Sequence, residues 1–225
     1  MTRQVALLGH PVAHSLSPRM HNAAFAARAL DWHYAAFDVE DVVAAVRALL
    51  ALGFAGANVT IPHKRAVVAA CDEAEGDAVN TLVLRDGRVL GFNTDRAILA
   101  GIDARRACVI GAGGAARTLA PALPPDTSYF SRSGQWPPRA EHADLVVNAT
   151  PVREELLVEP RAGQTVVDLA YGPDGAETAL VAAARTAGCT IVDGLEALVR
   201  QGARSFELWT GLAAPVEAMR RAARR

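Results

Sequence analysis

The chain has 225 residues, of which 51% are hydrophobic, and its 23 basic and 24 acidic residues leave a formal net charge of −1. This size allows one large hydrophobic core or two modest ones, and the balanced charge gives no reason to expect nucleic acid or an anionic membrane as a partner. No apolar stretch reaches membrane-spanning length, and the three cysteines lie far apart without metal-ligand spacing. We therefore expect a globular cytoplasmic protein with reduced cysteines and no metal site.

Along the first part of the chain, short apolar runs alternate with helical patterns, which predicts an α/β architecture. We expect strands at residues 5–8, 34–37 and 56–61, followed by a hairpin of residues 81–84 and 89–90. Asp86-Gly87, between the last two runs, favours a tight hairpin turn. Two helices are expected between the strands, with Ser17 as the N-cap of the first and Asp38 as the N-cap of the second.

A second α/β unit begins with a buried strand expected at residues 107–110, which runs directly into Gly111-Ala112-Gly113-Gly114-Ala115-Ala116. Small residues in this pattern, between a strand and a helical stretch through Leu119, let a pyrophosphate approach the backbone of a dinucleotide-binding unit. The alternative is a glycine-rich turn needed only for packing. Further strands are expected at residues 127–130, 145–148, 165–169 and 190–192, which predicts a Rossmann-like sheet.

The residues after the second strand of this unit bear on the choice of cofactor. A carboxylate about 20 residues after the glycine-rich turn commonly binds a free ribose 2′-hydroxyl. This chain has Ser131-Arg132-Ser133 there, without an acid. An arginine flanked by two hydroxyls suits a 2′-phosphate, so the sequence favours NADP over NAD. The alternative is a solvated arginine in a turn.

A single lysine, Lys64, stands among 23 basic residues, the rest of which are arginine. A lysine amine can give and take protons, whereas arginine stays protonated, so this choice suggests that Lys64 takes part in a reaction. The alternative is that one lysine codon remained by chance during a general drift to arginine. Hydrogen-bonding residues accompany it near strand ends; each alone is an ordinary cap or turn residue, but together they suit a polyhydroxylated ligand. They are Ser15, Ser17, Asn58, Thr60, Asn80, Thr81, Asn93, Thr94 and the acid Asp95.

Eight motifs follow one another in order along nearly the whole chain. They are His14-Ser15-Leu16-Ser17-Pro18, Asn58-Val59-Thr60-Ile61-Pro62-His63-Lys64, Ala78-Val79-Asn80-Thr81-Leu82, Asn93-Thr94-Asp95, residues 111–115, Asn148-Ala149-Thr150, residues 168–171 and Asp193-Gly194-Leu195. Together they resemble the shikimate dehydrogenase family. The resemblance implies reduction of 3-dehydroshikimate to shikimate with NADPH, a step of aromatic amino-acid (chorismate) biosynthesis.

The same resemblance implies roles for individual residues. Lys64 and Asp95 would be the catalytic pair that flanks the reacting oxygen, where Lys64 either donates a proton or orients the group and stabilises its charge. Ser15 and Ser17 would hold the substrate carboxylate. The other implied substrate-binding residues are Asn58, Thr60, Asn80, Asp95, Tyr171 and Gln201. The implied cofactor-binding residues are Gly111, Ala112, Gly113, Gly114, Ala115, Ser131, Arg132, Ser133, Thr150, Leu169 and Gly194.

The family's architecture implies two α/β domains with a cleft between them. A discontinuous substrate-binding domain would comprise residues 1–97 and 194–225, and a Rossmann-like NADP-binding domain residues 98–193. After Gly194 the chain is expected to form a helix that returns to the first domain and presents Gln201. The implied partners are small molecules, with no nucleic acid and no membrane, and the protein is expected to be a monomer or a homodimer.

The chain is shorter than expected for the family in three places: before Ala78, between Ser133 and Asp144, and after Thr150. Only ten residues separate Ser133 from Asp144, and prolines are among them. A crossover helix needs about a dozen residues or more, so we expect an extended connection instead, with a thinner wall for the adenosine pocket.

Two residues depart from the family's motifs. Arg96 follows Asp95 where glycine is usual, and its guanidinium either points to solvent or lowers the pKa of Asp95 and alters substrate preference. Pro151 stands where serine is common, which the sequence does not explain.

Two alternatives to a shikimate dehydrogenase stay open at this point. One is a sister enzyme that acts on quinate or an aminoshikimate. The other is a catalytically silent shikimate-binding sensor of the same fold, against which the presence of both Lys64 and Asp95 argues, because a sensor needs no proton donor.

Overall fold

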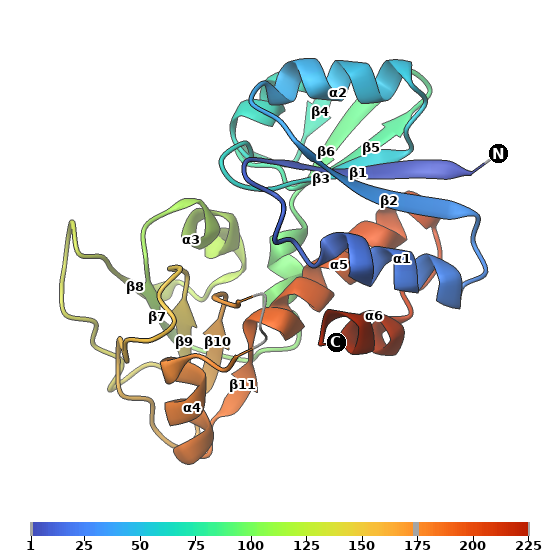
Figure 1. Cartoon of the computed structure of the whole chain (residues 1–225). Coiled ribbons are helices and arrows are strands. Elements are labelled where there is room, and N and C mark those ends of the chain that lie inside the picture. The colour runs from blue at the N-terminus through green and yellow to red at the C-terminus, as the bar shows by residue number, and fades with distance from the viewer. Residues whose placement is uncertain (1, 173–175, 225) are drawn as a thin grey trace. The chain divides into compact units, whose positions relative to one another are not determined.

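The structure is a computed structural model that describes residues 2–172 and 176–224. The chain forms two compact units: unit 1 is Met1–Asp95 together with Val199–Arg225, and unit 2 is Arg96–Leu198. Each unit has its own sheet and its own hydrophobic core, which confirms the predicted α/β class (Figure 1). The predicted domain limits lie after residue 97 and before residue 194; they stay a prediction, as does the cleft.

Unit 1 contains a six-stranded mixed sheet in the order β2-β1-β3-β5-β6-β4. Its strands are β1 (Arg3–Gly9), β2 (Trp32–Asp38), β3 (Gly56–Val59), β4 (Glu73–Ala74), β5 (Thr81–Arg85) and β6 (Arg88–Phe92). β1 is parallel to β2 and β3, whereas β5 is antiparallel to β3 and β6. The register places Asn58 beside Thr81 and Thr81 beside Phe92, so the segments that follow β3 and β6 begin next to the start of β5.

The third predicted strand is shorter than expected. β3 ends at Val59 rather than at Ile61, because the chain turns there and the backbone N–H of His63 donates to the carbonyl oxygen of Thr60 over 2.9 Å. Pro62 has no N–H with which to extend the strand pairing. The turn matters for the site, since Lys64 lies in it.

The predicted hairpin is confirmed as β5 and β6. Asp86 and Gly87 both have positive φ angles, 53° and 74°, as this kind of two-residue turn requires. The two-residue strand β4 is too short for a periodic pattern, so the sequence does not predict it.

The helices of unit 1 cover both faces of its sheet, with α2 on one face and α1, α5 and α6 on the other (Figure 1). Their bounds are α1 (Ser17–Ala27), α2 (Val42–Ala51), α5 (Gly194–Thr210) and α6 (Val216–Ala223), with the 3-10 helices η1 (Ala66–Ala70) and η2 (Thr94–Leu99). The unit limits fall inside η2 and α5. No helix in the described part of the chain has both the length and the apolar character that a membrane span requires.

Both predicted N-caps are wrong. Ser17 is the first residue of α1, and Leu16 occupies the N-cap without a side-chain hydrogen bond. The N-cap of α2 is Asp41, whose carboxylate accepts a hydrogen bond from the N–H of Ala44 over 3.0 Å. Asp38 cannot cap α2 because β2 runs on to that residue.

The core of unit 1 has an aliphatic side and an aromatic side. Val42, Val46 and Leu49 of α2 pack with strand residues on the first side. On the second side, the ring of His21 stacks on Tyr34 with their centroids 4.7 Å apart. Among the described residues, neither ring nitrogen of His21 has a hydrogen-bond partner, and burial lowers its pKa to about 3. The ring is therefore neutral at physiological pH.

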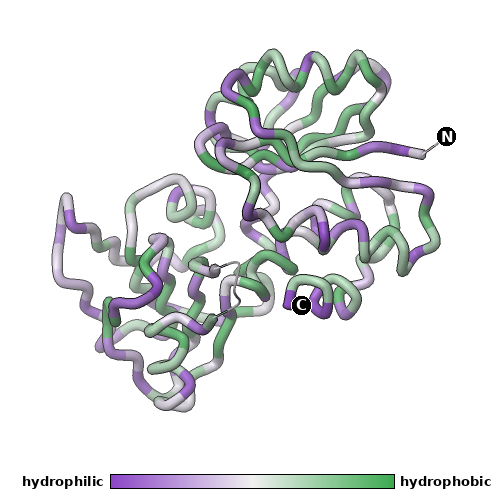
Figure 2. Tube along the Cα trace, viewed as in Figure 1, coloured by the Kyte–Doolittle hydropathy of each residue, from purple (hydrophilic) through white to green (hydrophobic). Residues whose placement is uncertain are grey.

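Unit 2 contains a five-stranded parallel sheet in the order β11-β10-β9-β7-β8, and its predicted strands are confirmed. The elements are β7 (Arg106–Ile110), α3 (Gly114–Leu119), η3 (Ala120–Ala122), β8 (Asp126–Phe130), β9 (Leu145–Asn148), β10 (Thr165–Asp168), α4 (Ala179–Thr186) and β11 (Thr190–Val192). α3 and α4 pack into different core clusters, so both faces of the sheet are covered. Hydrophobic stretches along the central strands agree with this burial (Figure 2).

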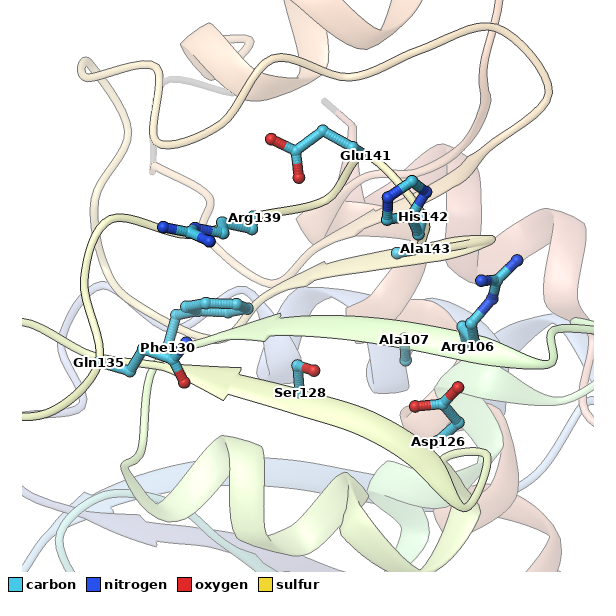
Figure 3. A pocket seen from close by; sticks show the side chains of 10 residues that line it. All are labelled: Arg106, Ala107, Asp126, Ser128, Phe130, Gln135, Arg139, Glu141, His142 and Ala143. Carbon is cyan, nitrogen blue, oxygen red and sulfur yellow. The ribbon is translucent and has the colours of Figure 1, made fainter.

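The predicted extended connection between β8 and β9 is confirmed, since residues 131–144 contain no helix. β8 is an edge strand, and Ser128 and Phe130 on one of its faces line a cavity of about 500 Å³ together with Arg139 and Glu141 of the connection (Figure 3). The cavity opens on the side of β8 that a crossover helix would otherwise cover.

Candidate functional site

Lys64 and Asp95 form an ion pair in unit 1. Lys64 lies in the turn after β3, and Asp95 lies in η2, three residues after β6 ends. The lysine Nζ donates a hydrogen bond to the carboxylate Oδ2 over 2.7 Å. The two side chains are 21% and 10% exposed, so the pair is largely enclosed but keeps some access to solvent. A lysine so placed can exchange a proton with a bound group, which arginine cannot do.

Asn80 holds the second oxygen of the Asp95 carboxylate. Its Nδ2 donates to Oδ1 over 2.7 Å. The amide cannot be turned over, because the Oδ1 of Asn80 accepts the backbone N–H of Thr94 over 2.8 Å and an N–H group can only donate. Each oxygen of Asp95 therefore accepts a hydrogen bond, as an ionised carboxylate can.

A buried set of amide and hydroxyl groups continues inward from Asn80. Thr81 and Ser205 are 0% exposed, and their hydroxyl oxygens lie 2.8 Å apart. The Nδ2 of Asn58 lies 2.9 Å from Thr81 Oγ1 and 3.0 Å from Ser205 Oγ. The Oδ1 of Asn58 accepts a hydrogen bond from the hydroxyl of Tyr34 over 2.9 Å. The predicted residues Asn58 and Asn80 thus belong to one connected network.

Ser205 and Tyr34 are the members of this network that sequence reasoning missed. Ser205 lies four residues after Gln201 and hence on the same face of α5, which is the signal that could have found it. Tyr34 lies inside β2 and carries no comparable signal.

The predicted carboxylate-binding pair, Ser15 and Ser17, lies beside the end of β1. The backbone N–H of Ser17 donates to Ser15 Oγ over 3.3 Å. Thr60 follows β3, the parallel neighbour of β1, and a Cβ atom on Gly9 would lie 2.3 Å from its methyl carbon. Gly9 therefore allows the two strand ends to approach, and ligands of α/β sheets commonly bind outside such carboxyl ends.

The last two predicted substrate residues lie in different units. Gln201 is half-buried on α5 in unit 1, and its Oε1 is 3.5 Å from Thr94 Oγ1. Tyr171 belongs to unit 2, where burial raises the pKa of its hydroxyl. A common role for Gln201 and Tyr171 stays a prediction.

The structure bears on one of the two departures from the family motifs. Arg96 is exposed, which favours the alternative that its guanidinium points to solvent. Nothing in the structure explains Pro151.

The glycine-rich turn of unit 2 has the shape that a phosphate-binding backbone needs. Gly111 has a φ of 113°, and a Cβ atom there would lie 2.9 Å from the carbonyl oxygen of Ala149, so only glycine fits. Gly113 and Gly114 are exposed, and a Cβ atom on either would meet nothing within 4 Å. Their bare backbone therefore leaves room for a ligand to approach closely, which fits the pyrophosphate of a dinucleotide.

Arg132 is paired with a carboxylate of its own unit. Its Nη2 lies 2.5 Å from Glu155 Oε2, and its guanidinium lies 5.5 Å from the centroid of the Trp136 ring. The side chains of Arg132 and Glu155 are 64% and 54% exposed. Ser131 and Ser133 accompany it with their hydroxyl oxygens 3.3 Å apart. The cluster contains an arginine and two hydroxyls that suit a phosphate, but the guanidinium of Arg132 is already paired with the carboxylate of Glu155.

A second polar cluster in unit 2 surrounds the carboxyl ends of β9 and β10. Asn148 donates from Nδ2 to Asp168 Oδ1 over 2.8 Å and accepts at Oδ1 from the hydroxyl of Thr150 over 2.7 Å. Burial raises the pKa of Asp168, although a hydrogen bond from Thr178 opposes this shift. The cluster fixes the loop that carries Thr150, one of the predicted cofactor residues.

The remaining predicted cofactor residues flank these two loops. Ala112 is exposed and Ala115 half-buried in the glycine-rich turn. The N–H of Leu169 donates to the carbonyl oxygen of Asn148 over 3.0 Å. A Cβ atom on Gly194 would lie 2.5 Å from the carbonyl oxygen of Ala170, so glycine is needed where α5 begins.

The chain is similar along nearly its whole length to an enzyme named shikimate dehydrogenase (NADP(+)) from Moorella thermoacetica, with 42% identity over 276 residues that cover 99% of this chain and 93% of the relative. The chain belongs to the shikimate dehydrogenase family. A shikimate dehydrogenase (NADP(+)) from Methanopyrus kandleri is 39% identical, with 98% of this chain and 94% of the relative covered. Family models agree: residues 7–82 match the shikimate dehydrogenase substrate binding domain, and residues 194–224 match the shikimate 5′-dehydrogenase C-terminal domain.

A solved member of the shikimate dehydrogenase family has the same fold. The enzyme from Thermus thermophilus, solved in complex with NADP(H) and shikimate, superimposes with a TM-score of 0.87 at 33% identity, and the match covers 100% of this chain and 99% of that one. Because the alignment with the Moorella thermoacetica enzyme runs over 276 residues and this chain has 225, at least 51 aligned positions hold no residue of this chain. The chain is thus a compact member of the family.

Proposed function

We propose that this chain is an NADP-dependent shikimate dehydrogenase that reversibly reduces 3-dehydroshikimate to shikimate in aromatic amino-acid (chorismate) biosynthesis. The observation that carries the proposal is the enclosed pair of Lys64 and Asp95, joined over 2.7 Å, in a chain of this family. Residues 1–97 and 194–225, which include all of unit 1, would be the substrate-binding domain, and residues 98–193 would bind NADP.

The catalytic step divides between cofactor and protein. NADPH, held by the loops of residues 98–193, would supply the hydride for the carbonyl carbon of the substrate. Lys64 stabilises the negative charge that develops on the carbonyl oxygen and donates a proton from Nζ to that oxygen. Asp95 accepts the hydrogen bond of Lys64 at Oδ2 and thereby fixes the direction of the ammonium group. In the reverse direction Lys64, as the neutral amine, accepts the hydroxyl proton of shikimate.

Substrate binding would use the polar residues of unit 1. Ser15 and Ser17 would hold the carboxylate of the ring, and Thr60, Asn80 and Gln201 the ring hydroxyls. Directional hydrogen bonds of this kind select for the positions of hydroxyl groups, which is how a site separates shikimate from related ring acids. Asn58 of unit 1 and Tyr171 of unit 2 are the other residues proposed to bind substrate.

NADP binding would use the loops of unit 2. The bare backbone of residues 111–115 is proposed to receive the pyrophosphate, and Ser131, Arg132 and Ser133 the 2′-phosphate. Thr150, Leu169 and Gly194 are proposed to lie along the nicotinamide half. The open turn at Gly113 and Gly114 supports this assignment, because backbone N–H groups reach an anion best where no side chain intervenes.

The proposed setting is a monomer or homodimer in the cytoplasm. The three cysteines Cys71, Cys108 and Cys189 are free, which suits a reducing compartment. Light scattering during size-exclusion chromatography would give the oligomeric state directly.

The test is absorbance at 340 nm after mixing purified protein with shikimate or quinate, each with NADP or NAD. We expect reduction of NADP by shikimate to be the fastest of the four reactions. A preference for quinate would overturn the substrate assignment. Calorimetric binding of shikimate without any hydride transfer would overturn the enzymatic function and support a sensor.

A further inference from the structure

Ser205 lies in the centre of unit 1, where no solvent reaches it. It is 0% exposed on α5, and its hydroxyl is in reach of three side chains that come from β3, β5 and η2. The distances from Ser205 Oγ are 3.0 Å to Asn58 Nδ2, 2.8 Å to Thr81 Oγ1 and 3.3 Å to Thr94 Oγ1. Ser205 Oγ also lies 3.2 Å from the carbonyl oxygen of Gln201 on the preceding turn.

The directions of these hydrogen bonds follow from the number of protons available. The hydroxyl proton of Thr81 is donated to Asn80 Oδ1 over 3.1 Å, so in the 2.8 Å contact between Thr81 and Ser205 the hydroxyl of Ser205 is the donor. The amide nitrogen of Asn58 can only donate, so Ser205 accepts from it. The same amide nitrogen donates its second proton to Thr81 Oγ1 over 2.9 Å. The hydroxyl of Ser205 thus accepts from β3 and donates to β5, and so links α5 to two strands.

The network continues from this link to the catalytic pair. The Oδ1 of Asn80 accepts the hydroxyl proton of Thr81 over 3.1 Å and the backbone N–H of Thr94 over 2.8 Å. The Nδ2 of Asn80 is left to donate to Asp95. Asp95 in turn holds Lys64. Three hydrogen-bonding side chains, those of Thr81, Asn80 and Asp95, therefore connect Ser205 to the lysine Nζ.

Removing the hydroxyl of Ser205 would take a donor from Thr81 and an acceptor from Asn58. Thr81 would lose its shortest hydrogen bond, and one proton of the Asn58 amide would have to turn to the carbonyl oxygen of Asn80 at 3.2 Å. Thr81 donates to Asn80 Oδ1 over 3.1 Å, the same oxygen that accepts the backbone N–H of Thr94. A shift of Thr81 toward Asn80 would disturb the amide that orients Asp95.

We propose that Ser205 is a positioning residue that aligns the Lys64–Asp95 pair through Thr81, Thr94 and Asn80. The inference rests on the proposed function, because it assigns a kinetic consequence to the pair. It predicts that Ser205 controls turnover without touching substrate or cofactor.

The first variant is Ser205→Ala, with kcat, both KM values and the melting temperature measured on the full chain. We expect kcat to fall about tenfold, as the loss of one buried hydrogen bond suggests, while KM for NADP stays within twofold. The matched control is Thr210→Ala on the same helix, whose hydroxyl likewise bonds the preceding turn, at Phe206 O over 2.8 Å, but lies outside the network. The control should keep kcat within twofold.

A second pair of variants separates the hydroxyl from the packing at the next link. Thr81→Val removes the hydroxyl at nearly constant volume and should lower kcat about as much as Ser205→Ala. Thr81→Ser keeps the hydroxyl and should restore most of that loss. If both residues act through one series of hydrogen bonds, the fall in kcat of the double variant Ser205→Ala with Thr81→Val should be much smaller than the product of the two single falls.

The outcomes are distinct. A wild-type protein without turnover on shikimate would overturn the proposed function and this inference with it. An active wild type whose Ser205→Ala variant melts earlier but keeps kcat within twofold would overturn the inference alone, since the hydroxyl would then serve stability only. Multiplicative losses in the double variant would also overturn it, because the two residues would act separately.

Discussion

The two units each carry an ion pair at a candidate site, and the pairs differ in their surroundings. Lys64 and Asp95 in unit 1 are 21% and 10% exposed, and Asn80 holds the second carboxylate oxygen. Arg132 and Glu155 in unit 2 are 64% and 54% exposed. The first pair is therefore fixed by a buried network, whereas the second is held mainly by its own attraction.

Because the two pairs differ in enclosure, we expect them to have different roles. An exposed ion pair contributes about 0–1 kcal/mol to stability and is screened by salt, so a competing anion can replace its carboxylate at little cost. A partly enclosed pair with directed hydrogen bonds cannot rearrange without leaving donors unpaired. We expect changes in unit 1 to act on turnover and changes at Arg132 to act on cofactor affinity.

The largest expected effect is a fall in kcat from a change at Lys64. Lys64→Arg keeps the positive charge but not a group that can release its proton, so kcat should fall between about a hundredfold and ten-thousandfold. Steady-state kinetics with circular dichroism as a folding check would measure this. The control is the opposite exchange at the next, exposed position, Arg65→Lys, which should leave kcat within twofold. Near-normal rates for Lys64→Arg would remove the proton-donor role.

The next largest expected effect is a loss of folding stability in acid, and its sign differs between a buried group of unit 1 and one of unit 2. The ordinary pKa of His21 is 6.5, and burial beside Tyr34 and Trp209 lowers it to about 3. Between these values the unfolded chain binds a proton that the folded chain does not, so stability is full above pH 6.5 and falls by about 1.4 kcal/mol per pH unit below it. At pH 5 the loss should reach about 2 kcal/mol.

Urea unfolding between pH 7.5 and about pH 5 would test this, with tryptophan fluorescence as the signal. His21→Leu should remove the slope whatever its stability at neutral pH. The buried Asp168 of unit 2 has the opposite sign: its pKa is raised, so its contribution is lost as pH rises through the folded value. An unchanged slope in His21→Leu would mean that the ring is not the acid-sensitive group.

The sequence predicts the sheets and singles out Lys64, but it does not predict the network that holds this lysine. Apolar runs of strand length are local signals, and the choice of lysine over arginine at residue 64 is visible without a structure. Ser205 is different, because its partners Asn58 and Thr81 lie 147 and 124 positions away in the chain. Which side chains share a buried hydrogen bond depends on strand register and helix docking, and no local pattern carries that information.

The N-cap errors have a related cause. Asp38 precedes an apolar helical pattern and is a good cap by type, but β2 extends to that residue and Asp41 caps the helix instead. The sequence does not predict the Arg132–Glu155 pair either, because the pair depends on how the loops after β8 and β9 contact each other. The sequence therefore predicts residue types suited to a site more reliably than the contacts among them.

A smaller effect is expected from removing the arginine of the exposed pair. Arg132→Ala should raise KM for NADP about tenfold through the loss of a charged hydrogen bond, while KM for NAD and kcat at saturation change little. Arg139→Ala, which removes another exposed arginine beside the cavity, is the control for a general loss of positive charge. Equal effects of the two variants on NADP would contradict a specific role for Arg132.

The smallest effect would show whether Glu155 competes with the cofactor. Because its carboxylate lies 2.5 Å from the guanidinium of Arg132, a 2′-phosphate must displace it. Glu155→Gln removes the charge at nearly constant shape and should lower KM for NADP about two- to fivefold, the equivalent of an exposed ion pair. Glu154→Gln alters the neighbouring exposed glutamate and should not. The gain should shrink as salt rises, since screening weakens the wild-type pair. A KM for NADP that stays constant or rises in Glu155→Gln would mean that Glu155 positions Arg132 for the phosphate instead of competing with it.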